Sequence, residues 1–208
     1  MDYGLNKIFV EGLSDKLFLE FLLHKYFGIQ DENLIVDVEG KDKLANQPLL
    51  FDKRRVEENA KNLIIFDTDT SKNEGGRKHK LEWLRNLESE INSKFEIFLL
   101  PFDDDREGIL ENLLEDCINK EFSFFNDCWN SMIGCISESK VKDLNIPAQK
   151  AMIYSKIDLF KKHRNNVWDY KSSTKYDYTD AGIWSIDTGE NIELKKLVNF
   201  IEQNLFND

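Results

Sequence analysis

The sequence has few of the residues that build disulfide frameworks or thiol and imidazole metal sites. Its cysteines, Cys117, Cys128 and Cys135, are odd in number and lack CxxC spacing, and the three histidines lie far apart. No basic and then apolar leader precedes the first strand-like run, and no apolar run approaches the ~20 residues that span a bilayer. We therefore expect a cytoplasmic protein with no membrane partner, in which any metal is held by carboxylates.

Basic residues are outnumbered by acidic ones. The 208 residues include 28 Lys and Arg against 39 Asp and Glu, which leaves a formal net charge of -11. This balance argues against bulk attraction to nucleic acid, so a nucleic-acid partner would need a local basic surface or bridging metal ions. The length and a hydrophobic content of 41% predict one ordinary globular domain.

The first half of the chain alternates short apolar runs with longer amphipathic stretches, a pattern typical of parallel strands joined by helical crossovers. The expected strands are residues 7–10, 34–38, 62–66 and 95–100. The expected helices are residues 14–26, about 45–60, 77–91 and 108–119. The predicted fold class is α/β, with a Rossmann-like, mainly parallel sheet of about four strands flanked by helices.

Beyond residue 120 the alternation stops. We expect a core over residues 1–120 and, over residues 121–208, a mostly helical C-terminal extension packed on that core rather than an independent domain. Residues 139–180 contain nine Lys or Arg against five Asp, interleaved with aromatic side chains. That mixture neutralises phosphates and stacks on bases, so the candidate nucleic-acid contacts are Lys161, Lys162 and Arg164. A solvated basic face over an aromatic core explains the same pattern.

Carboxylates follow the ends of several expected strands. Glu11 follows the first strand, and Asp67 and Asp69 follow the third, where alternation in an extended segment would point both aspartates the same way. The carboxyl ends of parallel strands open onto one edge of the sheet. Carboxylates held together repel unless a proton or cation shares them, and hard divalent cations prefer oxygen ligands. These three residues are therefore the candidate metal site.

Two further acids belong to the same edge but have simpler explanations as well. Asp15 lies in the first turn of the expected helix over residues 14–26, where the helix dipole favours a negative charge. Glu111 lies in the opening turns of the helix after the fourth strand, where it also suits a solvated helix face. The acidic run at residues 103–105 is typical of a turn.

The run VEGLSD at residues 10–15, followed by DTD at residues 67–69, resembles the Toprim domain of topoisomerases, bacterial primases, recombination and RNA-maturation proteins, and overcoming-lysogenization-defect nucleases. The form seen here is most similar to the primase-like and nuclease branches. The resemblance covers about residues 6–116. Gly108 and Glu111, followed by two leucines, further resemble a group of uncharacterised stand-alone Toprim-like proteins.

The resemblance implies a site for Mg²⁺ or Mn²⁺. Asp67 and Asp69 would bind the ion, Glu11 would bind a second ion or act as general acid/base, and Asp15 and Glu111 would complete a two-metal arrangement. The implied function is divalent-metal-dependent phosphodiester chemistry on DNA or RNA, with Glu11, Asp67 and Asp69 as catalytic residues. The sequence lacks a Walker A motif, a zinc module and a tyrosine-bearing topoisomerase domain, so any ATPase or targeting function would come from a protein partner.

Two other functions stay open. One is a non-catalytic Toprim module that binds nucleic acid or protein in a metal-dependent way, which the negative net charge makes credible. The other is a haloacid-dehalogenase-like phosphatase, because residues 67–71 approximate its nucleophile loop and residues 103–105 its late acidic motif. That nucleophile normally follows the first strand of the core, whereas two strands come first here.

Overall fold

The computed structural model describes residues 2–70, 75–102, 104–160 and 178–206. The chain forms two compact units, the first comprising Met1–Leu113 with Asp187–Asp208 and the second Leu114–Ile186. The first unit is therefore built from both ends of the chain. The boundary at residue 120 stays a prediction.

The regular elements alternate between strands and helices up to the fourth strand, and helices follow. The strands are β1 (Lys7–Val10), β2 (Ile35–Asp37), β3 (Asn62–Asp67) and β4 (Glu96–Leu100). The helices are α1 (Leu13–Phe27), α2 (Lys53–Glu57), α3 (Arg77–Ile91), α4 (Leu110–Asp116), α5 (Phe124–Ser137), α6 (Gln149–Phe160) and α7 (Ile192–Leu205). Short 3₁₀ turns are η1 (Lys41–Asn46), η2 (Pro48–Leu50) and η4 (Lys120–Phe122).

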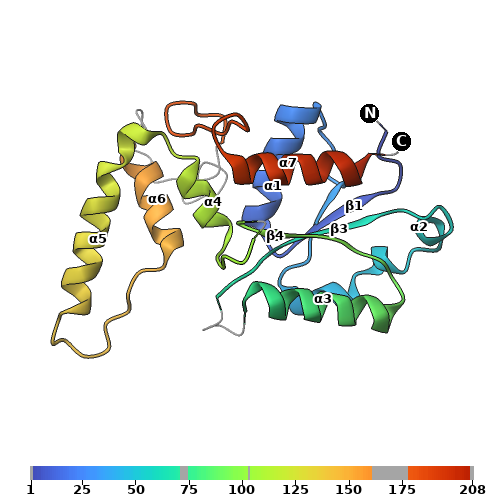
Figure 1. Cartoon of the computed structure of the whole chain (residues 1–208), viewed down its shortest axis with the longest axis horizontal. Helices are drawn as coiled ribbons and strands as arrows, with labels where there is room; N and C mark the ends of the chain where they lie inside the picture. Colours follow the sequence, from blue (N-terminus) through green and yellow to red (C-terminus); the bar gives the residue numbers. More distant parts are fainter. Residues whose placement is uncertain (1, 71–74, 103, 161–177, 207–208) are drawn as a thin grey trace. The chain divides into compact units, whose positions relative to one another are not determined.

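The strands form an all-parallel, four-stranded sheet in the order β2-β1-β3-β4. The chain first moves outward from β1 to β2, then returns to the other side of β1 to form β3 and β4 (Figure 1). The strand order therefore reverses between β1 and β3. The predicted α/β fold with a parallel sheet, flanking helices and a helical C-terminal region is confirmed.

Helices cover both faces of the sheet in the first unit. Figure 1 shows α1 and α7 over one face and α3 over the other. On the α3 side, Phe9 and Ile64 join Leu84 of the helix in one buried core cluster. On the other side, the ring of Phe98 in β4 lies 5.3 Å from that of Phe200 in α7. Side chains alternate between the two faces of a strand, so a strand made of consecutive apolar residues buries all of them only when both faces of the sheet are covered.

The helix expected over residues 45–60 is wrong. The structure has η1, η2 and the short α2 in this region. Pro48 begins η2, and Gln47 before it is extended with a ψ of 118°, because a proline disfavours the helical conformation in the residue that precedes it. In α2, Arg55 is buried and its guanidinium donates to the backbone carbonyl oxygens of Leu5 and Leu49. Arg55 thus ties this irregular segment to the rest of the first unit.

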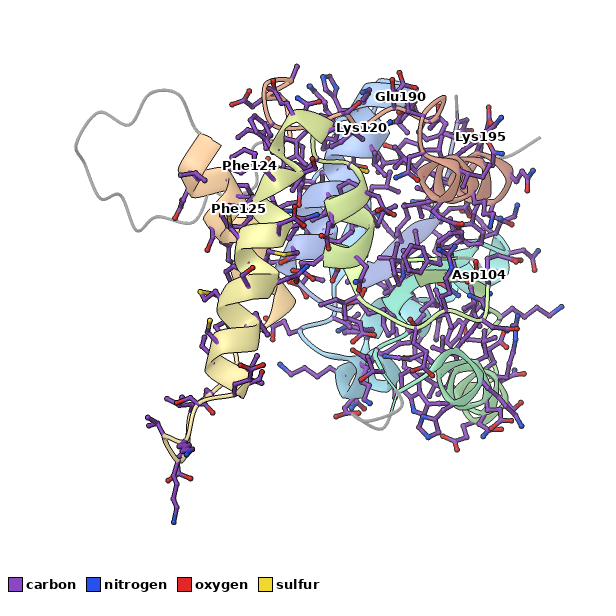
Figure 2. The ribbon with its side chains drawn as sticks, turned by 60° about the vertical axis from the view of Figure 1, so that its left-hand side comes forward. Asp104, Lys120, Phe124, Phe125, Glu190 and Lys195 are labelled. Carbon is purple, nitrogen blue, oxygen red and sulfur yellow. The ribbon has the colours of Figure 1, made fainter. Side chains whose placement is uncertain are left out.

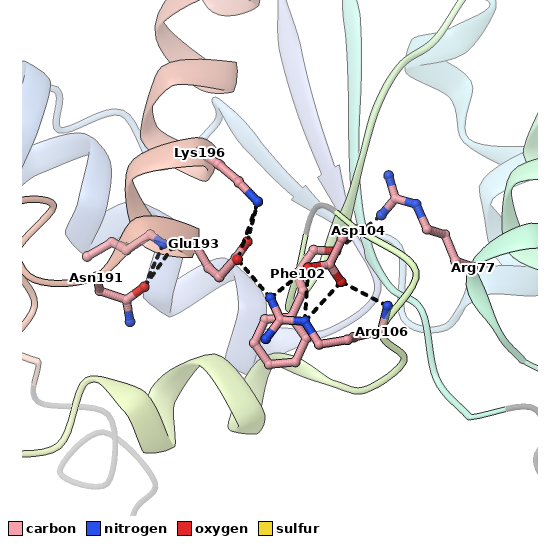
Figure 3. A network of polar contacts seen from close by, with 8 residues as sticks. Arg77, Phe102, Asp104, Arg106, Asn191, Glu193 and Lys196 are labelled. Atoms are coloured by element: carbon pink, nitrogen blue, oxygen red, sulfur yellow. Dashed lines mark hydrogen bonds and ion pairs between the residues drawn. The ribbon is translucent and has the colours of Figure 1, made fainter.

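An ion pair joins the loop that follows β4 to α7 (Figure 3). The guanidinium of Arg106 lies 3.9 Å from the ring centroid of Phe102 and bonds both Asp104, at 2.7 Å, and Glu193 of α7, at 2.8 Å. Hydrogen bonds from Arg106 lower the pKa of Asp104 to about 2. Asp104 therefore has a local structural role, while Asp103 lies outside the described residues.

The second unit contains α5 and α6. The residues just after α4 pair with residues 184–185, since the Ser185 N–H donates to the Cys117 carbonyl at 2.7 Å and Ile118 forms a β-bridge with Trp184. No residue of α5 is buried, and Figure 2 labels Phe124 and Phe125 where this helix begins.

The candidate nucleic-acid contacts Lys161, Lys162 and Arg164 lie outside the described residues. Among the helices that the structure describes, none has the length and apolar content needed to cross a membrane.

Candidate functional site

Two of the predicted acids stand where the strand order reverses. Asp67 is the last residue of β3, and Glu11 directly follows β1, whose Val10 pairs with Ile65 of β3. The two carboxylates therefore leave the carboxyl ends of neighbouring parallel strands. In open α/β sheets this reversal point is where ligands bind, because the loops on either side of it diverge and leave room between them.

Asp67 is at the centre of the acidic group. Its Oδ1 accepts the backbone N–H of Leu110 at 2.8 Å. Burial, and then the negative charges of the four other predicted site acids, raise the pKa of Asp67 well above its ordinary value; those acids are Asp15, Glu11, Glu111 and Asp69. The other four acids predicted from the sequence thus all act electrostatically on Asp67, and its carboxylate is unfavourable unless it takes up a proton or a cation lies nearby.

Asp15 and Glu111 are both buried. Asp15 is in the first turn of α1, where its Oδ2 accepts the Gly12 N–H at 3.0 Å and so stabilises the start of the helix. Glu111 lies in the first turn of α4, next to the residue whose N–H binds Asp67. The structure therefore gives Asp15 a capping function in addition to its place in the acidic group, and the solvated-face explanation of Glu111 is wrong.

Lys80 is a member of the site that the sequence analysis missed. Its Nζ donates to Oε1 of Glu11 at 2.7 Å and to Oδ2 of Asp69 at 2.9 Å, and only 2% of its side chain is exposed. Burial alone would lower the pKa of Lys80, but the charge of Glu11 and the hydrogen bonds to both carboxylates outweigh it, so that the pKa is raised. Burial raises the pKa of Glu11, and Lys80 opposes this rise. Lys80 is therefore a charged group held between two predicted ligands.

Helical spacing contained the signal for Lys80. The residue lies in the basic run at residues 77–80, which is typical of an exposed helix start. However, the buried Leu84 and Leu87 of α3 follow it by four and seven positions, which places Lys80 on the inward face of the helix. A lysine on that face requires an acidic partner, because burying an unpaired charge is costly.

The expectation that residues 67–69 continue as an extended segment is wrong. Asp69 has a φ of 55°, so the backbone turns after Thr68 and directs Asp69 to a partner different from that of Asp67. Gly75 makes the turn possible, because a Cβ at this position would lie 2.5 Å from the Cβ of Asp69 and 2.9 Å from two backbone oxygens. The only sign of this close approach in the sequence is the Gly75–Gly76 pair in a polar loop.

Thr68 connects the end of β3 to the loop that precedes α4. Its buried Oγ1 lies 2.9 Å from the Leu100 carbonyl oxygen and 3.0 Å from that of Gly108, and it accepts the Gly108 N–H at 2.8 Å. A Cβ on Gly108 would lie 2.5 Å from Oδ1 of Asn112, so a larger residue here would displace the Asn112 side chain. Thr68 thereby holds the start of α4 close to the end of β3.

The donor atoms of the site suit a hard divalent cation in kind, because all are carboxylate oxygens. Their concentration around Asp67 raises the pKa of that residue, and either a proton or a cation in addition to the ammonium of Lys80 would relieve the repulsion. Within the described ranges, however, no three Asp, Glu, His or Cys are arranged as ligands of an ion. These carboxylates therefore suit a divalent ion in their chemistry and in their proximity to Asp67. Binding would require their side chains to turn toward the ion.

A protein family of unknown function, DUF3226, matches this chain over residues 5–204, and the chain belongs to that family. The match covers both compact units. No curated protein and no solved structure matches the chain. Its function has to be argued from the site.

Proposed function

We propose that this member of the DUF3226 family performs divalent-metal-dependent phosphodiester chemistry on nucleic acid, as a Toprim-type nuclease. The main support is the position of Asp67, which ends β3 at the reversal point of the sheet and is surrounded by four further carboxylates. A structural role alone would favour an arrangement with fewer mutually repelling charges. The order and spacing of Glu11, Asp67 and Asp69 along parallel strands agree with the Toprim resemblance.

The proposed ligands are Glu11, Asp15, Asp67, Asp69 and Glu111. When bound there, Mg²⁺ or Mn²⁺ would lower the pKa of a bound water and stabilise the charge of the leaving oxygen. The protein itself fixes Asp67 through the Leu110 N–H and Glu11 through Lys80. Burial raises the pKa of Glu11, and a raised carboxylate pKa suits a group that accepts a proton from attacking water.

The substrate in this proposal is DNA or RNA, recognised through its phosphates. Because the net charge of the whole chain is -11, nucleic acid would have to bind at a local basic surface. The proposed contacts to the sugar-phosphate backbone are Lys161, Lys162 and Arg164. The proposed setting is the cytoplasm. A protein partner would supply any ATP-driven or targeting step, because the sequence has no Walker A motif.

A cleavage assay with purified protein tests the proposal. Single-stranded and duplex DNA and RNA are incubated with Mg²⁺, Mn²⁺ or EDTA. We expect metal-dependent cleavage that falls by about 100-fold or more in Asp67→Asn and Glu11→Gln, because each loses charge stabilisation in the transition state. Asp104→Asn is the control, since Asp104 bonds Arg106 in the loop after β4. Equal activity in all three variants would assign the cleavage to a contaminant.

The same variants distinguish the two alternatives. Metal-dependent binding of nucleic acid without cleavage would select the non-catalytic module. Rapid hydrolysis of a generic phosphate monoester, lost in Asp67→Asn and also in Asp104→Asn, would select the phosphatase. The pairing of Asp104 with Arg106, which also donates to Glu193, argues against this last outcome, because Asp104 already has a structural partner.

A further inference from the structure

The position of Lys80 bears on how many ions the site takes. We infer that the ammonium of Lys80 occupies the place of a second cation, so that the site binds one divalent ion per chain rather than the two that the nuclease resemblance implies. The inference deepens the proposed function and depends on it. It assigns the ion to Asp67 with Asp15 and Glu111, and it assigns Glu11 and Asp69 to Lys80.

Lys80 is held in this place from both ends. Its backbone N–H donates to the Gly76 carbonyl at 2.9 Å in the first turn of α3. Its Nζ lies 6.0 Å from the ring centroid of Phe66 and reaches Glu11 and Asp69 at 2.7 and 2.9 Å. A side chain that is 2% exposed has little room for another rotamer. The ammonium is therefore a fixed part of the site and does not exchange with solvent as an ion does.

The ammonium and a second ion would compete for the same two carboxylates. In two-metal sites the ions lie about 3.5–4 Å apart and share carboxylate ligands. An ion bound by Glu11 and Asp69 would either displace Lys80, leaving a buried charge without a partner, or lie beside the ammonium and be repelled by it. Asp67 differs from these two acids, because the partner on its Oδ1 is the neutral N–H of Leu110. The favourable place for a single ion is therefore beside Asp67.

Lys80 also supplies what a second ion would supply. A lysine ammonium is a compact point charge that binds phosphate oxygens, and here it stands at the same sheet edge as the proposed ion. Lys80 additionally orients Glu11, the proposed proton acceptor. The site would then keep part of its positive charge when metal is scarce.

The experiment counts bound ions rather than turnover. Mn²⁺ is titrated into the metal-free full chain by calorimetry, and the electron paramagnetic resonance spectrum is recorded at saturation. We expect one Mn²⁺ per chain in wild type. Lys80→Gln keeps a hydrogen-bonding group but removes the charge, and we expect two ions with the line broadening of a close Mn²⁺ pair. Lys80→Arg keeps the charge and should bind one ion.

Lys78→Gln is the matched control, because Lys78 lies on the same helix, 90% exposed, with Nζ 3.9 Å from Glu82. It should behave as wild type. Two ions in wild type, or one ion in a folded Lys80→Gln, would overturn the inference while leaving the metal site in place. No bound ion in wild type would overturn the proposed function itself. Two ions in wild type or in Lys80→Arg would overturn the inference even if Lys80→Gln does not fold.

Discussion

Nζ of Lys80 lies 2.7 Å from Oε1 of Glu11, although 69 residues separate the two along the chain. This contact joins the first turn of α3 to the end of β1, and the second contact of Lys80 adds Asp69. The site acids are therefore of two kinds. Glu11 and Asp69 share a fixed cation, whereas Asp67 receives a neutral N–H and the repulsion of its neighbours.

The two aspartates of the DTD run should respond oppositely to removal of charge. In EDTA at pH 7, Asp67→Asn should raise the free energy of unfolding by about 1 kcal/mol or more, because it removes the charge that burial and four acids disfavour. Asp69→Asn should lower it by about 1 kcal/mol, because it weakens a charge-assisted bond to buried Lys80. Urea unfolding of both variants checks this. The same sign for both would mean that Lys80 does not separate their environments.

The pH dependence of stability follows from the raised pKa of Asp67. An acid whose folded pKa lies above its unfolded value destabilises the fold when ionised; this penalty begins to shrink as pH falls below the folded pKa and is gone below the unfolded pKa. The stability advantage of Asp67→Asn in EDTA should therefore be largest at neutral and higher pH and vanish below about pH 4, the ordinary range of an aspartate. Urea midpoints measured from pH 4 to 8 test this. An advantage that is constant with pH would show that charge is not its cause.

A divalent ion that binds only the folded protein should stabilise it. At roughly a hundred times its dissociation constant it adds about 2.7 kcal/mol, which for a chain of this size raises the melting temperature by about 5–10 °C. Thermal melts in EDTA and in saturating Mg²⁺ or Mn²⁺, at fixed ionic strength, measure the shift. Asp67→Asn should lose most of it. An identical shift in wild type and variant would place ion binding elsewhere on the chain.

The close approach of Gly75 to Asp69 predicts a strict requirement for glycine. Gly75→Ala should cost about 1–3 kcal/mol of stability, as overpacking does, because it displaces Asp69 from its hydrogen bond with Lys80. Gly134→Ala in α5 is the matched control, because a Cβ added at Gly134 would meet nothing within 4 Å. That substitution should be neutral or stabilising, since alanine favours a helix. Urea unfolding of both variants compares the effects.

The order of secondary structure was accessible to sequence reasoning because local patterns specify it. Strands buried on both faces appear as short apolar runs, as in residues 62–66, and amphipathic spacing identified α3. Where local signals conflicted, as around Pro48, the prediction of one helix was wrong.

The acids themselves could be found from the sequence, because carboxylates that follow buried parallel strands meet at one edge of the sheet whatever the details of packing. Which cation each acid faces was decided only by the tertiary structure. The turn at Asp69 depends on the approach of Gly75, and Lys80 reaches Glu11 only because β3 and α3 place the helix start beside the end of β1. Local periodicity indicates that Lys80 faces inward but not which acid it meets, since the energy of such a contact depends on segments brought together by folding.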